Sequence, residues 1–203
     1  MADHDKGADD KRSLRRRENI EERRKLLAGP AMAPLVRYVA GLRAAEPDKE
    51  FPDFDPLDGG TGAEILFLFE KPGPMTSVGG LGSGFISRNN DDPTAEATFG
   101  FMNQAGIPRQ QVIIWNVIPG WNGTRKVTAK ELRDGVASLT ELLRLLPRLR
   151  TVVLVGRRAQ RARSLIEPLN MRVFVSAHPS PLVRASRPDE WRAIPDAWAQ
   201  AAV

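Results

Sequence analysis

Four short and almost continuously apolar runs constrain the fold of this 203-residue chain more than any other feature. The runs are residues 63–69, 112–117, 151–156 and 172–176, and segments with helical patterning separate them. A strand that is apolar on both faces is typical of a parallel sheet covered by helices on both sides. The sequence therefore predicts an α/β fold with three layers, α/β/α, around a central, four-stranded and mainly parallel sheet.

The segments between these runs carry signals for helix ends. Asp92 is placed to cap a helix, and Thr128 forms a capping box with Glu131 three residues later. Residues 46–62 are rich in Pro, Gly and Asp and predict a long loop that leads into the first strand. Helices are expected over residues 18–27, 30–45, 93–105, 128–146, 157–168 and 187–203.

The first 30 residues are highly charged and predict an N-terminal arm or helix, followed by a single α/β domain over residues 31–203. The arm contains a basic run from Lys11 to Arg17. Two interpretations are open for it. The run contacts a DNA backbone, or it belongs to a solvated terminal helix or tail, and charge runs of this kind favour the second.

Composition narrows the chemistry of the chain. The absence of cysteine excludes disulfides, thiolate metal sites, iron–sulfur clusters and cysteine nucleophiles. The net charge of +5 suits a polyanionic partner, because phosphates neutralised by a protein release counterions. No apolar run is long enough to cross a membrane, and the N-terminus lacks the apolar core of a signal peptide. We expect a monomeric protein of the cytoplasm that does not bind membranes.

Polar side chains lie at or just after the ends of three of the four predicted strands. Glu70 follows the first strand, Asn116 lies at the end of the second, and His178 follows the fourth. The carboxyl ends of parallel strands share one edge of the sheet, which is where open α/β sheets bind ligands. An acid, an amide and an imidazole are therefore expected to converge at one site.

The order and spacing of these residues resemble those of the uracil-DNA glycosylase superfamily over roughly residues 62–186. The first motif of that family is matched by Phe69-Glu70-Lys71-Pro72-Gly73. The second motif, His-Pro-Ser-Pro-Leu, is complete at residues 178–182. The resemblance implies the four-stranded fold of the family. It also implies a monofunctional enzyme that hydrolyses the bond between uracil and deoxyribose in DNA, with no metal or cofactor.

The resemblance also implies roles for single residues. Asn116 would read the edge of uracil, and Phe85 would stack on the flipped base. His178 would stabilise the negative charge on the departing uracil. Leu182 would fill the gap that the base leaves in the duplex. The remaining residues expected to contact DNA are Pro72, Gly73, Ser77, Ser180, Arg184 and Ser186.

The chain departs from the family pattern at Lys71, where many relatives carry an Asp or Asn that orients the attacking water. A protonated amine cannot accept a proton, so Lys71 is grouped with the base-binding residues and Glu70 with the catalytic ones. Asp91 and Asp92 are alternatives if their loop folds over the site. Relatives that share Glu-x-Pro-Gly hold a cluster with four cysteines, whereas this chain has none, so the resemblance implies a cluster-free branch or a divergent one.

Lys71 leaves two other functions open. One is a DNA-binding relative that has lost turnover, and the other is an N-glycosidase that acts on a different base or on a free nucleoside.

Overall fold

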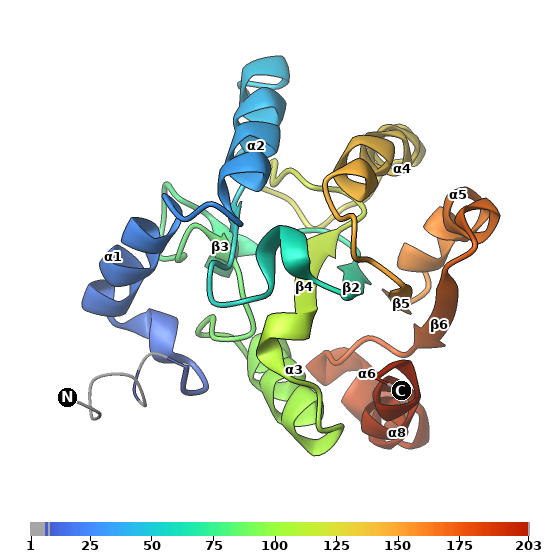
Figure 1. The fold of residues 1–203 in the computed structure, drawn as a ribbon. Coiled ribbons are helices and arrows are strands. Elements are labelled where there is room, and N and C mark those ends of the chain that lie inside the picture. The colour runs from blue at the N-terminus through green and yellow to red at the C-terminus, as the bar shows by residue number, and fades with distance from the viewer. Residues whose placement is uncertain (1–6, 8, 203) are drawn as a thin grey trace.

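A computed structural model describes residues 7 and 9–202 and confirms the predicted three-layer α/β fold (Figure 1). The central sheet has the strand order β4-β2-β5-β6, and all neighbouring strands are parallel. Its strands are β2 (Ile65–Phe69), β4 (Val112–Asn116), β5 (Thr151–Val155) and β6 (Arg172–Ser176). Every residue of β2, β4 and β5 is buried, as expected for strands covered on both faces.

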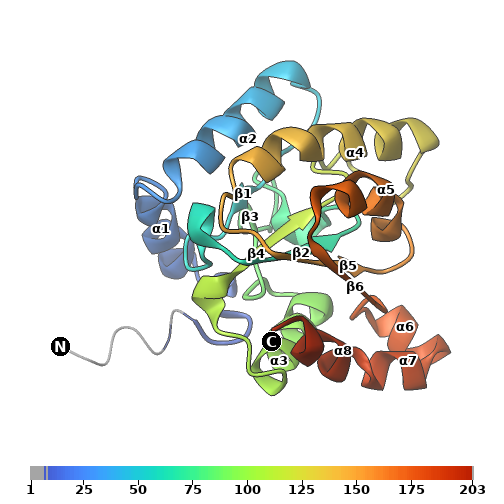
Figure 2. The same cartoon turned by 45° about the vertical axis from the view of Figure 1, so that its right-hand side comes forward.

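Helices cover both faces of the sheet (Figure 2). One face carries α2 (Ala33–Ala45), α4 (Ala129–Arg144) and α5 (Arg163–Ile166), and the other carries α3 (Pro93–Gln104) and α8 (Ile194–Ala201). Fully buried Trp198 on α8 packs edge-on against Phe67 of β2, with ring centroids 4.8 Å apart. This aromatic contact anchors the C-terminal helix on the central strand.

The remaining elements are short or lie outside the sheet. They are α1 (Arg17–Leu26), α6 (Pro181–Ser186), α7 (Pro188–Arg192), the strands β1 (Asp53–Phe54) and β3 (Phe85–Ile86), and 3₁₀ turns at Ser13–Arg15, Gly60–Gly62, Pro74–Thr76, Arg109–Gln111, Ala159–Ala162 and Glu167–Leu169. Strands β1 and β3 pair in parallel with each other, inside segments that the sequence predicts as loops.

The capping predictions are confirmed. The Asp92 side chain accepts hydrogen bonds from the backbone N–H groups of Thr94 and Ala95, and Thr128 forms the predicted capping box with Glu131. The expected helix over residues 157–168 is instead broken into short helical turns. The expected C-terminal helix is divided into α7 and α8, because Pro195 lacks the N–H group that a continuous helix would use.

Residues 9–27 of the N-terminal region contact the α/β domain. Leu14 is buried, and the guanidinium of Arg23 is buried beside the carboxylate of Asp55 at 2.5 Å. Arg12 donates to Glu96 on α3 at 2.8 Å. Residues 9–27 therefore pack against the domain instead of extending into solvent. Ion pairs supply much of this contact. Since the acidic partners are distant in sequence, the basic residues read from the sequence alone resemble a solvated charge run.

Candidate active site

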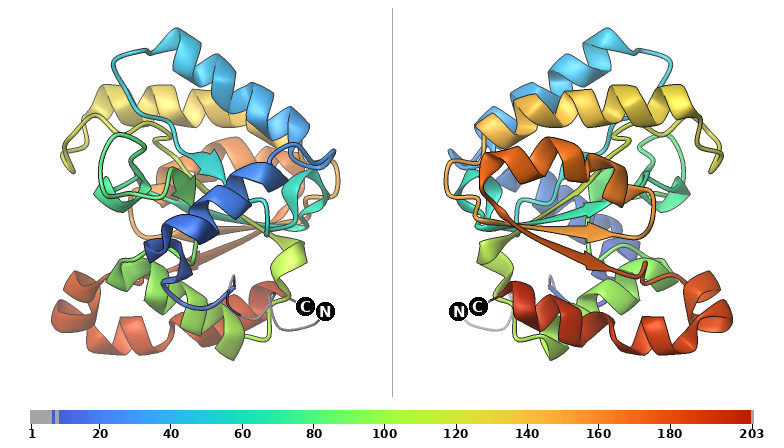
Figure 3. Two further views of the ribbon diagram at one scale, coloured as in Figure 1. Left: turned by 90° about the vertical axis from the view of Figure 1, so that its left-hand side faces the viewer. Right: turned by 90° about the vertical axis from the view of Figure 1, so that its right-hand side faces the viewer.

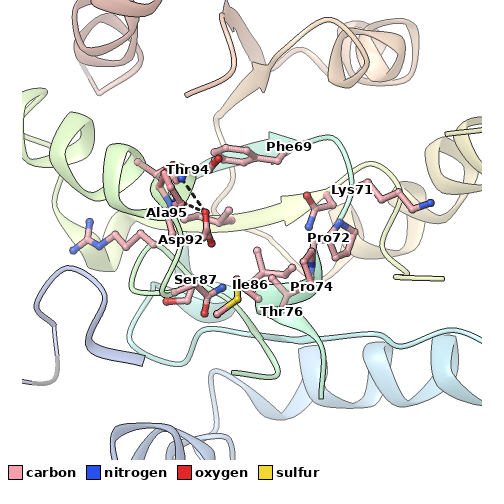
Figure 4. A pocket seen from close by; sticks show the side chains of 18 of the residues that line it. Phe69, Lys71, Pro72, Pro74, Thr76, Ile86, Ser87, Asp92, Thr94 and Ala95 are labelled. Carbon is pink, nitrogen blue, oxygen red and sulfur yellow. Dashed lines mark hydrogen bonds between the residues drawn. The ribbon is translucent and has the colours of Figure 1, made fainter. Parts of the chain in front are cut away.

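A cavity of about 410 Å³ opens at the carboxyl edge of the sheet, where β2, β4 and β6 end (Figure 4). One wall comes from Phe69 at the end of β2 and from residues 71–76 in the loop after it. Another comes from the segment that runs from β3 into α3 and contributes residues 86–88, 90, 92–95 and 98. Asn116, Arg125, His178 and Pro181 complete the lining together with Ile114. The strand ends thus bring Asn116 and His178 into one cavity, as the parallel topology predicts.

Asn116 is the last residue of β4 and is 5% exposed. Its side-chain amide makes no hydrogen bond to the residues that the structure describes, although it lines the cavity. An amide offers one acceptor and two donor positions, and a buried amide of this kind needs partners. Asn116 is therefore free to bind a ligand that presents both a donor and an acceptor.

His178 follows β6 and lies edge-on to Phe69, with ring centroids 5.6 Å apart. Burial lowers the pKa of His178, and nearby Glu70 opposes this effect only in part. The imidazole is therefore neutral near pH 7 and serves as a hydrogen-bond donor. Gly156, with φ of +88°, fits closely behind it, because a Cβ atom there would lie 3.2 Å from the Cβ of His178.

The aromatic wall of the cavity is Phe69, the last residue of β2. Phe85, the expected stacking residue, is 1% exposed in β3 and is not among the cavity-lining residues, whereas its neighbour Ile86 is. The placement of Phe85 therefore gives no support to its stacking role. The signal for Phe69 was its position as the first residue of the first motif.

The three candidate acids are placed very differently. Glu70 forms an ion pair with Arg158, and Asp91 pairs with Arg12 at 3.2 Å; neither is among the cavity-lining residues. Asp92 does line the cavity, where Figure 4 shows it facing the side formed by Pro72 and Pro74.

The carboxylate of Asp92 is partly satisfied by the start of α3. Its Oδ1 atom accepts hydrogen bonds from Thr94 N at 2.9 Å and from Ala95 N at 3.0 Å. Burial raises the pKa of Asp92, and the two backbone N–H groups offset this only in part. A carboxylate that is costly to ionise binds a proton more readily than an exposed one.

Lys71 does not present its amine to the cavity, and Figure 4 shows the side chain pointing away. Its Nζ atom donates to Glu131 Oε1 and Asn122 Oδ1, both at 2.8 Å, and to the carbonyl oxygen of Lys126 at 2.9 Å. Although burial acts to raise it, hydrogen bonds from Lys71 and Thr128 hold the pKa of Glu131 at about 2. Lys71 thus fastens the first motif to the start of α4, and these contacts give no support to base binding.

Replacing Lys71 with methionine should lower the free energy of unfolding by about 1–3 kcal/mol, because the partly buried carboxylate of Glu131 loses its cation. Urea denaturation measures this change. The matched control is Lys130→Met, which breaks the exposed ion pair with Asp134 and should cost less than about 0.5 kcal/mol. Equal losses in the two variants would contradict the anchoring role.

Residues expected to contact DNA gather on α6. Leu182 is 76% exposed, and Arg184 and Ser186 are also exposed. The Ser186 hydroxyl donates to the Leu182 carbonyl oxygen at 2.8 Å, and the Arg184 guanidinium lies 5.0 Å from the Trp191 ring centre. Ser180 caps the helix by accepting from Val183 N. The helix therefore presents an apolar tip beside a cation at the rim of the cavity.

In the first motif, Pro72 and Gly73 line the cavity as part of its wall. The Ser77 hydroxyl, by contrast, donates to Glu50 Oε2 at 2.5 Å, and the next N–H group, that of Val78, donates to the same oxygen at 2.8 Å. A carboxylate thus stands where a phosphate was expected, so the predicted contact between Ser77 and phosphate is not supported.

Sequence reasoning missed Arg125, an exposed cation that lines the cavity from the loop before α4. It lies outside both motifs, and only the fold brings it to the site. Among the described residues, no group of three or more histidine, aspartate or glutamate side chains is arranged to hold a metal ion. No helix in this described part is both long and apolar enough to cross a membrane.

Comparison with known families agrees with this geometry. The sequence model of the Uracil DNA glycosylase superfamily matches residues 60–201, which contain the whole central sheet and every residue that lines the cavity. A comparison with curated proteins found no match. The family match spans more than half of the chain and includes both motifs. The chain belongs to the uracil DNA glycosylase superfamily.

Proposed function

We propose that the protein is a uracil-DNA glycosylase that hydrolyses the N-glycosidic bond of deoxyuridine in DNA, the first step of base excision repair. Membership of the superfamily supports a glycosylase-type hydrolase with DNA as its substrate. The finer proposal rests on two groups that line the same cavity. One is the Asn116 amide, which makes no hydrogen bond to the described residues, and the other is the neutral imidazole of His178.

In this proposal the base leaves the duplex and enters the cavity, as enzymes that act on bases require. The Asn116 side chain donates to the O4 carbonyl of uracil and accepts from N3–H. Cytosine presents the opposite pattern at these two positions, so a fixed amide selects uracil. Phe69, which lines the same cavity, supplies an aromatic surface for the base.

Bond cleavage leaves a negative charge on uracil and a positive, oxocarbenium-like sugar. The neutral imidazole of His178 donates a hydrogen bond to the O2 atom of uracil, where this charge develops. A water molecule forms the new bond to C1′ and passes its proton to Asp92. Uracil leaves with the electron pair of the broken bond and is protonated afterwards.

Asp92→Asn should lower the single-turnover rate of uracil release by about 10²-fold, at the low end for a general base because the sugar cation reacts readily with water. Asparagine still caps α3, so folding is preserved. Burial raises the pKa of Asp92 above its ordinary value of 3.8, so the carboxylate gains a proton at a pH above 3.8 as the solution is acidified. The wild-type rate should therefore begin to fall above pH 3.8. That acidic limb should be absent in the variant.

The control for this prediction is Asp91→Asn, which changes the neighbouring carboxylate that pairs with Arg12 outside the cavity lining. Its rate and pH profile should match the wild type. An unchanged rate for Asp92→Asn would remove Asp92 from the mechanism.

Leu182→Ala should slow release from double-stranded DNA by about tenfold and leave release from single strands unchanged, because an apolar wedge helps only when a stacked base must be displaced. The comparison uses the same uracil-containing oligonucleotide with and without its complement. Leu182 is 76% exposed, so its truncation should not affect folding. Equal slowing on the two substrates, or no slowing on the duplex, would argue against the wedge.

The direct test is release of uracil from a labelled single-stranded oligonucleotide in the presence of a chelator, with alkali used to reveal abasic sites. Release supports the proposal. Binding without release would favour a DNA-binding relative that lacks turnover. Release of another base from matched oligonucleotides, but not of uracil, would favour an N-glycosidase with a different specificity.

A further inference from the structure

A second concave surface lies between α1 and the loop before β3. This surface, here called the α1 groove, has a volume of about 220 Å³. One wall comes from the 3₁₀ turn before α1 and from α1 itself, with Leu14, Arg15, Arg17, Ile20, Glu21 and Arg24. The other, the loop wall, is formed by Val78, Gly80, Leu81 and Gly82.

The groove is rich in positive charge that the described residues leave without an ion-pair partner. Arg15, Arg17 and Arg24 are exposed, and none of them forms an ion pair or a side-chain hydrogen bond with the described residues. Nearby Arg12 and Arg23, by contrast, are bound to acids. Glu21 is the single acidic side chain among the residues that line the groove. Three free guanidinium groups around one acid suit a polyanion.

The loop wall adds exposed apolar surface. Leu81 is 94% exposed and Val78 is 53% exposed. The loop is nevertheless held in place, because Glu50 accepts from the Ser77 hydroxyl and from two backbone N–H groups that follow it. Arg24 approaches from the other side, with its Nη2 atom 3.7 Å from the position of a Cβ atom at Gly84. An apolar tip is thus presented next to cations.

The loop wall of the groove adjoins the wall of the active-site cavity. Ser83 N donates to the Met75 carbonyl oxygen at 3.0 Å, and a Cβ atom at Gly82 would lie only 2.7 Å from the carbonyl oxygen of Pro74. Pro74 and Met75 both line the cavity. In Figure 3 (left), the start of α1, the loop before β3 and the red C-terminal helices near α6 lie toward the same side of the molecule.

We propose that the α1 groove binds the substrate DNA strand beyond the nucleotide that enters the cavity. Arg15, Arg17 and Arg24 contact successive phosphates, and Leu81 packs against the sugars and bases between them. Alternating cationic and apolar surface matches the alternating phosphate and nucleoside of a strand. The inference rests on DNA as the substrate, but not on the chemistry at uracil.

The test measures the affinity for a fluorescein-labelled, uracil-free single strand by anisotropy over a range of salt concentrations. The variant replaces Arg15, Arg17 and Arg24 with glutamine. Each phosphate contact contributes about 0.7 to the slope of log K against log salt on single strands, so loss of three should reduce the slope by about 2. Affinity at low salt should fall by about 10–100-fold.

The matched control replaces Arg37, Arg144 and Arg150 with glutamine. These arginines are also exposed and form no ion pair with the described residues, but they lie on α2, at the end of α4 and before β5. The net charge changes equally, and the slope should stay unchanged. Equal reductions in the two triple variants, or no reduction in either, would overturn the proposal.

A second variant, Leu81→Ser, tests the apolar part of the surface. It should weaken binding several-fold and leave the salt slope unchanged, because no charge is removed. Unchanged affinity would remove Leu81 from the contact. Because the strand contains no uracil, the outcome is independent of catalysis. If the arginine variant changes the salt slope but the protein releases no uracil, the groove is retained and the glycosylase activity is rejected. If the protein releases uracil but the salt slope is unchanged, only the groove is rejected.

Discussion

Replacing His178 with alanine should slow the single-turnover release of uracil by about 10³-fold, while the affinity for uracil-free DNA stays unchanged. The imidazole is the donor placed to meet the charge on the leaving base, and loss of one such donor typically costs 10²–10³-fold in rate. His178 lines the cavity, and its ring makes no hydrogen bond with the described residues, so truncation should leave the fold intact.

The companion variant His178→Gln retains an N–H donor and should recover part of the lost rate. Protonation provides an independent check. Because burial lowers the pKa of His178, the active neutral form persists as the pH rises from 6.5 to 8. The rate should therefore stay constant over this interval. A rate that falls with rising pH would indicate that the imidazolium ion is the active form and would contradict the mechanism.

Replacing Asp55 with alanine should lower the free energy of unfolding by about 3–5 kcal/mol, because two buried guanidinium groups lose their shared carboxylate. Asp55 is 1% exposed. Its Oδ2 atom lies 2.5 Å from Arg23 Nη1 and 2.6 Å from Arg109 Nη2, and it also accepts from the Ser87 hydroxyl. Urea denaturation followed by far-ultraviolet circular dichroism measures the loss.

The control for Asp55 is Asp189→Ala, which removes an exposed partner of Arg192 and should change stability by less than about 0.5 kcal/mol. A similarly small effect at Asp55 would show that the buried cluster contributes little to stability. Ser87 lines the active-site cavity, so Asp55→Ala should also reduce catalysis at temperatures where the protein remains folded.

The sheet could be predicted from the sequence because its signals are local. Continuous apolar runs identify parallel strands, and Asp92 and Thr128 mark helix starts through their own backbone neighbours. The convergence of Asn116 and His178 follows from the parallel topology, which brings the strand ends to one edge.

The partners of charged residues could not be predicted, because they are distant in sequence. Lys71 meets Glu131, which is 60 residues away, and Glu70 meets Arg158, which is 88 residues away. These two long-range contacts engage both side chains with partners outside the two motifs, whereas the carboxylate of Asp92 lines the cavity. No local pattern specifies such pairings.

The buried cluster around Asp55 also has a consequence for synthesis on the ribosome. Helix α1 is made early, but its Arg23 reaches Asp55 only after 32 more residues, and Arg109 joins Asp55 after a further 54. Until then the arginine would have to be buried without its full set of partners, which is unfavourable. The N-terminal segment is therefore expected to dock late during translation. The loop that carries Ser87, which donates to Asp55, and Asn89, which accepts from Arg109, would settle in the same step.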